Sequence, residues 1–173
     1  LQVGRGSTIS KKISLIRNTS RINLSITDRT VQGSSTQQEP CPFDIYITAD
    51  NSIKDAANLV PDGSPVVTFL PMDLQTDGNS YQIRFRAKQL IIGRTADIII
   101  DDVATGKNIF NENIIDIILG HPEYNTQRDL DREDIYELEF EIERDPDGYV
   151  VKIIISVNGW DVEYIEPTSS RFP

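Results

Sequence analysis

The sequence has few of the residues from which catalytic and metal sites are usually built. Its 173 residues include one cysteine, Cys41, and one histidine, His121. A single cysteine excludes an intrachain disulfide and a cysteine-based zinc site, although it does not fix the cellular compartment. The preceding residues Gln38, Glu39 and Pro40 are polar, whereas a lipid-attachment cysteine requires apolar and small residues there. Cys41 is therefore not predicted to carry a lipid.

Long apolar runs and clustered bases are also missing. No apolar run approaches the roughly 18 residues that a helix needs to cross a bilayer. The first residues, Leu1–Gly6, lack the apolar core of a signal peptide, so we expect a chain that was processed or cut from a longer protein. Lysine and arginine number 17 against 27 aspartates and glutamates, a net charge of -10. Because phosphate binding needs clustered cations, no nucleic-acid partner is predicted.

Apolar and polar residues alternate with a period of two through much of the sequence, which predicts β-strands. Between 136 and 143, for example, apolar residues alternate with four glutamates. Other runs are apolar on both faces, as expected for covered strands within a sandwich. Half-buried strands are predicted at 22–27, 43–48, 81–88 and 136–143, fully apolar ones at 66–70, 96–100 and 150–157, and shorter ones at 13–16 and 162–165.

One segment has the helical period instead. Phe110, Ile114, Ile117 and Ile118 recur at the spacing of one helix face, which predicts a short helix over Asn113–Leu119. An asparagine at its start can cap the helix, and the glycine and proline that follow can end it.

These elements predict a single all-β domain over residues 1–173, an antiparallel β-sandwich with one short helix. The sequence Asp145-Pro146-Asp147-Gly148 is predicted to close a hairpin between two long strands. Residues 31–42 are predicted to form a polar loop, and 166–173 a short tail. No internal repeat or linker divides the chain.

The exposed faces of two predicted strands carry opposite charges. The face of 82–88 is basic, and that of 137–143 is acidic. Because opposite charges stabilise neighbouring strands, we expect these two strands to be neighbours or to face a common partner.

No group of residues indicates catalysis, a cofactor or a metal. His121 lies in a loop after the predicted helix, without a nucleophile or a partner that would make it a general base. The four glutamates of 137–143 share one strand face, whereas glycosidase carboxylates oppose each other across a cleft. The aspartates at 101–102 and 145–147 lack the spacing of a calcium loop and are interpreted as turn residues.

Two short motifs lie in the last third of the chain. The first, Leu130, Asp131, Arg132, Glu133 and Asp134, leads into the strand predicted at 136–143. Its arginine can bridge neighbouring carboxylates and fix the start of that strand. The second motif is a tight-turn sequence followed by a large apolar side chain, and both motifs are interpreted as structural. The second motif consists of Asn158, Gly159 and Trp160.

In their order, these motifs resemble the C-terminal domain of the FimB-type fimbrial anchor proteins, which belong to the fimbrillin (type V pilus) system of Bacteroidales. Weaker similarity at Leu15–Ile22, Ile45–Asn51 and Phe69–Pro71 extends the resemblance to about residues 13–165. The resemblance implies a transthyretin-like β-sandwich in a fimbrial accessory subunit at the cell surface. It further implies a lipoprotein of the outer membrane that anchors a fimbria and limits its length, with pilin subunits as partners.

This chain departs from the family pattern, because it has neither a lipid-bearing cysteine near its start nor a signal peptide. Membrane attachment is therefore expected through an upstream lipidated N-terminus, and the chain is expected to be one domain of a longer protein. The resemblance implies assembly by β-strand addition, in which a pilin strand joins an open sheet edge. The short tail agrees with a subunit that accepts a strand without donating one. The sequence does not identify the accepting edge, which is either here or in the missing domain.

The alternative interpretation is a fimbrial tip adhesin or a carbohydrate-binding module on the same sandwich. It requires an exposed aromatic platform, for which Tyr124, Tyr149, Trp160 and Tyr164 are the candidates. An enzyme is the third interpretation, and it lacks a catalytic constellation.

Overall fold

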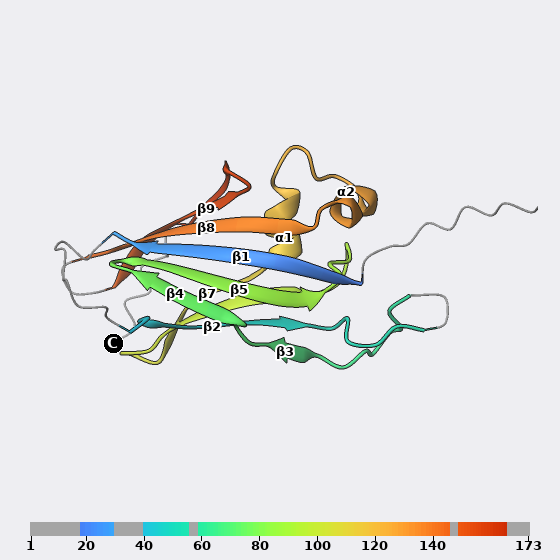
Figure 1. The fold of residues 1–173 in the computed structure, drawn as a ribbon, viewed down its shortest axis with the longest axis horizontal. Helices are drawn as coiled ribbons and strands as arrows, with labels where there is room; N and C mark the ends of the chain where they lie inside the picture. The colour runs from blue at the N-terminus through green and yellow to red at the C-terminus, as the bar shows by residue number, and fades with distance from the viewer. Residues whose placement is uncertain (1–17, 30–39, 56–58, 146–148, 166–173) are drawn as a thin grey trace, which may run out of the picture.

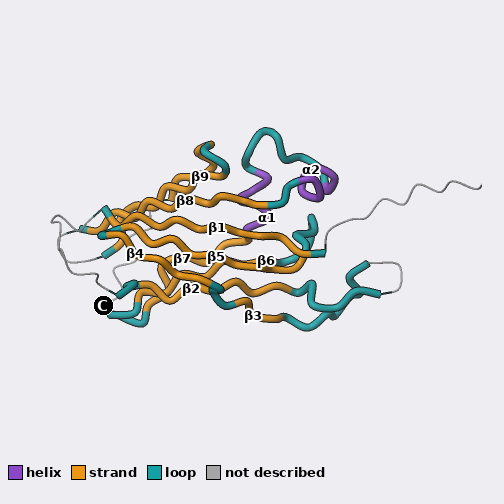
Figure 2. Tube along the Cα trace, in the orientation of Figure 1, coloured by secondary structure: helices purple, strands orange, loops and turns teal. Residues whose placement is uncertain are grey.

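The computed structural model describes residues 18–29, 40–55, 59–145 and 149–165. In this part of the chain, two β-sheets stack as a sandwich, accompanied by two short helices (Figure 1, Figure 2). The strand predicted at 13–16, most of the predicted 31–42 loop, three residues of the Asp145–Gly148 turn and the tail lie outside the described residues.

The six-stranded sheet has the order β10-β9-β8-β1-β5-β4, and the four-stranded sheet has the order β3-β2-β6-β7. The elements are β1 Thr19–Asp28, β2 Phe43–Ala49, β3 Val67–Phe69, β4 Asp73–Asp77, β5 Ser80–Lys88, β6 Ala96–Asp102, β7 Lys107–Asn113, α1 Ile114–Leu119, α2 Gln127–Arg132, β8 Ile135–Arg144, β9 Val150–Val157 and β10 Trp160–Ile165.

The core lies between the sheets and follows directly from the period-two alternation. The inward residues of β1, β5 and β8 are buried, while the residues between them face outward. Across the two sheets, Phe110 of β7 and Phe140 of β8 pack edge to face, with ring centroids 5.1 Å apart. Phe43 of β2 packs in the same way against Tyr81 of β5, at 5.7 Å. Burial of these apolar faces is what holds the two sheets together.

The central strand β1 pairs on both sides with strands far from it in sequence. It is antiparallel to β5 and parallel to β8. The other strand pairs of the described residues are antiparallel, so the predicted all-β sandwich is confirmed with one parallel pair inside it. The predicted neighbourhood of the basic and acidic strands is wrong, because β1 lies between them.

Several elements differ from the prediction. The strands β4 and β7 were not predicted, because both are sheet edges with mostly polar residues and little alternation. The predicted helix is confirmed as α1, capped by the Asn113 side chain, which accepts a hydrogen bond from the Ile115 N–H at 2.9 Å. A second helix, α2, makes the prediction of a single helix wrong.

A buried ion triad joins the two sheets at the end of β8. The Arg144 guanidinium lies 3.1 Å from an Asp28 carboxylate oxygen of β1 and 2.8 Å from an Asp102 oxygen of β6. All three side chains are largely buried. Burial by itself would raise the pKa of Asp102, but hydrogen bonds from Thr105 and Arg144 outweigh it and hold that pKa below 3.8. Removing one member of such a group leaves an uncompensated buried charge.

We predict that Arg144→Met lowers the free energy of unfolding by about 3–5 kcal/mol, because Asp28 and Asp102 then lose their buried cation. Urea unfolding at pH 7 measures this. Arg128→Met is the control: Arg128 is exposed on α2, and its replacement is expected to cost less than about 0.5 kcal/mol.

The same triad sets a pH dependence. A carboxyl group whose folded pKa is depressed stabilises the fold above its unfolded pKa, and this contribution is lost as pH falls through the folded value. The wild type should therefore lose stability more steeply than Arg144→Met below pH 3.8, the ordinary pKa of the Asp102 carboxyl group. Parallel loss in both proteins would show that the triad does not contribute.

Candidate functional site

The sandwich has two sides along which edge strands of the two sheets face each other. On one side lie β7 and β10, and on the other lie β3 and β4. Because edge strands carry unpaired backbone groups, these sides are where another chain can attach. The two sides differ in how they are covered.

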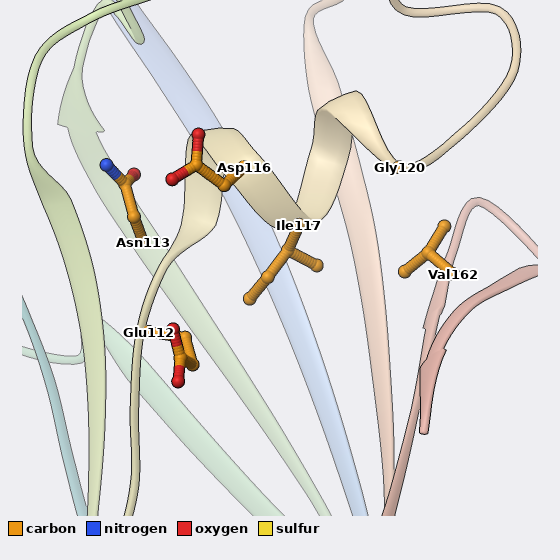
Figure 3. A pocket seen from close by; sticks show the side chains of 6 residues that line it. All are labelled: Glu112, Asn113, Asp116, Ile117, Gly120 and Val162. Atoms are coloured by element: carbon orange, nitrogen blue, oxygen red, sulfur yellow. The ribbon is translucent and has the colours of Figure 1, made fainter. Parts of the chain in front are cut away.

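Helix α1 covers the side between β7 and β10 (Figure 3). Four of its six residues are buried isoleucines, and Gly120 at its end packs so closely on Val162 of β10 that an added Cβ would lie 3.2 Å from the Val162 Cβ. A groove of about 270 Å³ remains beside the helix. The groove is lined by Glu112, Asn113, Asp116, Ile117, Gly120 and Val162.

The side between β3 and β4 lacks such a cover in the described part of the chain. Strand β3 has only three residues and pairs with Ile47–Ala49 of β2, so it does not extend along Phe43–Tyr46. The Val103 N–H donates to the Pro42 carbonyl at 2.9 Å. Since hydrogen bonding alternates along an antiparallel strand, Phe43 and Ile45 direct their backbone groups away from β6, toward the line that β3 would occupy if it were longer.

Across from this β2 edge, β4 presents an apolar side chain that the four-stranded sheet does not cover. Leu74 pairs with Ile83 of β5 and so lies on the inner face, yet it is 46% exposed whereas Ile83 is 1% exposed. Met72, just before β4, is 64% exposed. We call the region formed by the Phe43–Tyr46 edge, Met72 and Leu74 the β3–β4 notch.

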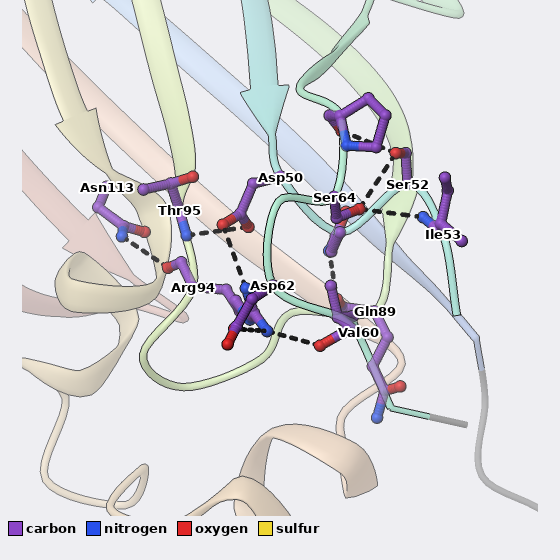
Figure 4. Close-up of polar contacts among 12 residues, drawn as sticks. Asp50, Ser52, Ile53, Val60, Asp62, Ser64, Gln89, Arg94, Thr95 and Asn113 are labelled. Atoms are coloured by element: carbon purple, nitrogen blue, oxygen red, sulfur yellow. Dashed lines mark hydrogen bonds and ion pairs between the residues drawn. The ribbon is translucent and has the colours of Figure 1, made fainter. Parts of the chain in front are cut away.

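The segment between β2 and β3 also carries exposed apolar side chains, those of Ile53, Leu59 and Val66. Arg94 holds the segment in place, because its guanidinium donates to the Val60 carbonyl at 2.5 Å and pairs with Asp62 at 3.4 Å (Figure 4). These apolar side chains therefore lie on a loop that Arg94 anchors.

The two sequence motifs meet at the opposite end of the sheet, where a tyrosine links them. The Tyr124 hydroxyl donates to a Glu133 carboxylate oxygen at 3.1 Å and accepts from the Asn158 side-chain amide at 2.6 Å. The Glu137 N–H donates to the Asn158 side-chain oxygen at 2.9 Å. Burial and the Glu133 carboxylate raise the pKa of Tyr124 to about 12. Asn158 has a φ of 49° and Gly159 a φ of 79°, as a tight Asn-Gly turn requires.

The first motif is the end of a helix and not only the start of a strand. Leu130, Asp131 and Arg132 are the last residues of α2, and the Leu130 carbonyl accepts from the Tyr136 hydroxyl at 2.9 Å. Arg132 pairs with Asp129 of its own helix at 2.8 Å. Among the described residues, it forms no ion pair with the carboxylates of its own motif. The capping pattern Thr126-x-x-Asp129 at the start of α2 is the sequence signal that could have predicted this helix.

Asp131 and Asp134 of the first motif contact the end of β5 and the strand β1. An Asp131 oxygen accepts from the side-chain amides of Gln89 and Gln127, at 2.5 and 3.0 Å, which ties α2 to the end of β5. Asp134 is exposed, and its carbonyl accepts from the Arg21 N–H at 3.3 Å, where β8 begins beside β1. Apart from the Gln127 contact, which lies within α2, these contacts connect different secondary-structure elements, so the motif holds the fold together.

The aromatic candidates do not form one platform among the described side chains. Trp160 is 53% exposed and Tyr149 is 62% exposed, but they follow and precede β9 and so lie at its opposite ends. Tyr124 is buried, and the side chain of Tyr164 is outside the described part. His121 is also buried: it packs between the rings of Tyr124 and Trp160, and its Nδ1 accepts from the Glu123 N–H at 3.1 Å.

The acidic candidates are engaged in local contacts. Asp101 accepts from the Tyr46 hydroxyl at 3.2 Å and from Asn108 at 2.9 Å. Glu141 of the acidic strand pairs with Arg29 at 2.6 Å. Among the described residues, no three side chains are grouped as metal ligands. In the same residues, neither helix has the length and apolar character needed to cross a membrane.

One family model matches nearly the whole chain. It describes the fimbrillin-A associated anchor proteins Mfa1 and Mfa2, and it matches residues 1–166. The resemblance drawn from the two motifs is therefore confirmed at the level of the family. No curated protein matches the chain.

Solved structures support the fold. The fimbrial anchor protein Mfa2 from Porphyromonas gingivalis is 17% identical with a TM-score of 0.66, over 86% of this chain and 49% of that one. A candidate adhesin from Bacteroides ovatus is 21% identical with a TM-score of 0.67, over 88% of this chain and 51% of that one. The chain thus spans about half the length of these structures.

We predict that Asn158→Ala lowers the free energy of unfolding by about 2 kcal/mol, because it removes the link between the motifs and places an alanine at positive φ. Urea unfolding measures the loss. Asn125→Ala is the control, since Asn125 is exposed and makes only local contacts. Equal effects of the two changes would contradict the role assigned to the Tyr124 link.

Proposed function

This chain belongs to the family of fimbrillin-A associated anchor proteins Mfa1 and Mfa2, and we propose that it is a cell-surface accessory domain to which a pilin subunit attaches by β-strand addition. The observation that carries the proposal is the β3–β4 notch. There an unpaired stretch of sheet edge and an uncovered apolar side chain occur together among the described residues.

The backbone of β2 supplies the hydrogen bonds of the proposed attachment. A strand lying in line with β3 and antiparallel to β2 would pair with Phe43 and Ile45. Residues 43–46 accommodate about four residues of such a strand, or about 13 Å at 3.3 Å per residue. Backbone hydrogen bonds of this kind provide affinity with little dependence on sequence.

The side chains of the notch supply the specificity. Alternate residues of the added strand would point inward, where they would cover Leu74 and Met72 from the side that is now open. Apolar residues at every second position meet this requirement, because burying one large apolar side chain contributes about 1.5–3 kcal/mol. A pilin strand with that alternation would therefore be selected over a polar one.

Anchoring of the fimbria is the second part of the proposal. We infer that the longer protein is an outer-membrane lipoprotein, attached through a lipidated N-terminus upstream of this chain, and that it ends the fimbria by accepting a strand without passing one on. Family membership and the half-length match to solved relatives support this part. The domain is proposed to act without catalysis, which the structural contacts of His121 and the acidic side chains support.

The adhesin alternative retains one favourable observation, the exposed indole of Trp160. The second exposed aromatic candidate, Tyr149, lies at the far end of β9. Binding to neutral glycans that Trp160→Ala abolishes would support this alternative.

We predict that Leu74→Glu in the full-length protein weakens binding of its pilin about tenfold or more, since an added strand would then bury a charge on the inner face. Gln75→Glu is the matched control: it introduces the same residue at the next position of β4, on the exposed outer face. Pilin binding measured by biolayer interferometry should change less than about twofold for that variant.

Two results would overturn the proposal at different levels. If pilin lacking its terminal strand binds as well as the intact subunit, attachment does not occur by strand addition. If the terminal strand is required but Leu74→Glu and Gln75→Glu bind equally, the accepting edge lies outside the notch. Thermal unfolding of both variants separates lost binding from lost folding.

A further inference from the structure

Positive charge is concentrated at the start of this acidic chain. The first 27 residues contain five of the 17 lysines and arginines and none of the 27 aspartates and glutamates. Arg21, the last of these five, is described by the structure and lies on the outer face of β1. Next to it, β5 directs Arg84, Arg86 and Lys88 to the same exposed face. We call these four residues the cationic stripe.

The cationic stripe contains like charges at close range. Arg21 and Arg86 are directly opposite each other on paired strands, an arrangement that destabilises a sheet unless an anion compensates it. Arg84 pairs with Asp73 at 3.1 Å. Within the described part of the chain, Arg21, Arg86 and Lys88 have no ion-pair partner. Among the described residues, three of the four cations of the stripe thus have no carboxylate paired with them, and Arg84 has one.

A fifth cation lies at the end of the stripe. The Lys54 ammonium group donates to the Asn18 side-chain oxygen at 3.0 Å and to the Gln89 side chain. Burial lowers the pKa of Lys54, the Asp131 charge opposes this effect, and the Lys88 charge adds to it. Lys54 therefore extends the positive region beyond the end of β5.

We propose that the cationic stripe binds a linear acidic polysaccharide, a ligand independent of the pilin strand. Side chains on one face of a strand repeat every 6.8 Å or so, so that Arg84, Arg86 and Lys88 form a row of cations with regular spacing. Guanidinium groups bind sulfate and carboxylate groups through paired hydrogen bonds. Gln82 beside the row adds an uncharged amide that can bond to sugar hydroxyls.

The surrounding face favours a linear ligand over an anionic membrane. Glu137, Glu139 and Glu141 of β8 lie on the same face, one strand away from Arg21 of β1 and two strands away from the row of cations on β5. Two strand spacings amount to about 10 Å. A flat anionic surface would meet these glutamates, whereas a polymer running along β5 would avoid them. The aromatic residues of β5 are buried, so the stripe offers no stacking platform for nucleic-acid bases.

The test uses heparin as the acidic polysaccharide and the full-length protein. We expect the wild type to bind heparin and dextran sulfate but not neutral dextran, with an affinity that falls as salt rises. Arg86→Gln should weaken heparin binding about fivefold. This variant should also fold at least as stably as the wild type, because it removes the repulsion with Arg21.

Arg128→Gln is the control, since it removes the same charge from an exposed position on α2. Equal loss of heparin binding in both variants, absence of heparin binding at low salt, or equal loss of binding to single-stranded DNA and to heparin would overturn the proposal. So would preferential binding to vesicles containing anionic phospholipid. Pilin binding by Arg86→Gln should stay unchanged, because the stripe is on the outer face and the notch opens to the inner one.

Discussion

Every stable β-sandwich must cover the inner faces of both sheets, and in the described part of this domain the inner face is left open beside one very short strand. Strand β3 covers only the second half of β2, because it is three residues long. Leu74 is consequently an inner-face residue that remains half exposed, while its neighbour Ile83 is buried. The opposite side of the sandwich meets the same constraint with a helix whose isoleucines fill the space between β7 and β10. This contrast between the two sides is the reason why the notch is the proposed attachment site.

Contacts elsewhere in the molecule fix the middle of the six-stranded sheet, so that the fold is stable although this side is open. Strand β1 is held between β5 and β8, and the triad of Arg144, Asp28 and Asp102 joins it to the second sheet. At the other end, the Tyr124 link ties α2, β8 and the β9–β10 turn together. A rigid centre of this kind allows an edge to remain incomplete without loss of the fold.

The sequence predicted the elements whose signal lies within one strand or helix. It did not predict features that depend on how these elements pack against one another. Alternation in β1, β5 and β8 predicted these strands, and Asn113 with its isoleucines predicted α1, because such signals lie within one element. The strands β4 and β7 were missed because edge strands need few apolar residues. The basic strand β5 and the acidic strand β8 were expected to be neighbours because their charges attract, but charge alone does not fix the order of strands in a sheet. β1, which is 50 or more residues away from both in the sequence, lies between them.

The sequence predicted the kind of site, a sheet edge that accepts a strand, but not which edge forms it. The motifs around Leu130 and Asn158 indicated the family, yet they hold the fold and lie away from the notch. The notch itself is made by Phe43, Ile45, Met72 and Leu74, which look like ordinary strand residues in the sequence. The unpaired backbone edge at Phe43 and Ile45 and the exposure of Met72 and Leu74 follow from the length of β3. That length is decided by where the chain crosses from one sheet to the other at residues 70–72. No local pattern encodes this crossing.

If a pilin strand attaches at the notch, the free edge of β2 gains hydrogen bonds when the partner binds. Amide hydrogen exchange followed by NMR, with and without a synthetic peptide of the pilin's terminal strand, measures this residue by residue. The predicted result is slower exchange at the Phe43 and Ile45 amides on adding the peptide, with β7 and β10 unchanged. Slower exchange at β7 or β10 with no change at Phe43 and Ile45 would contradict the assignment of the notch as the accepting edge.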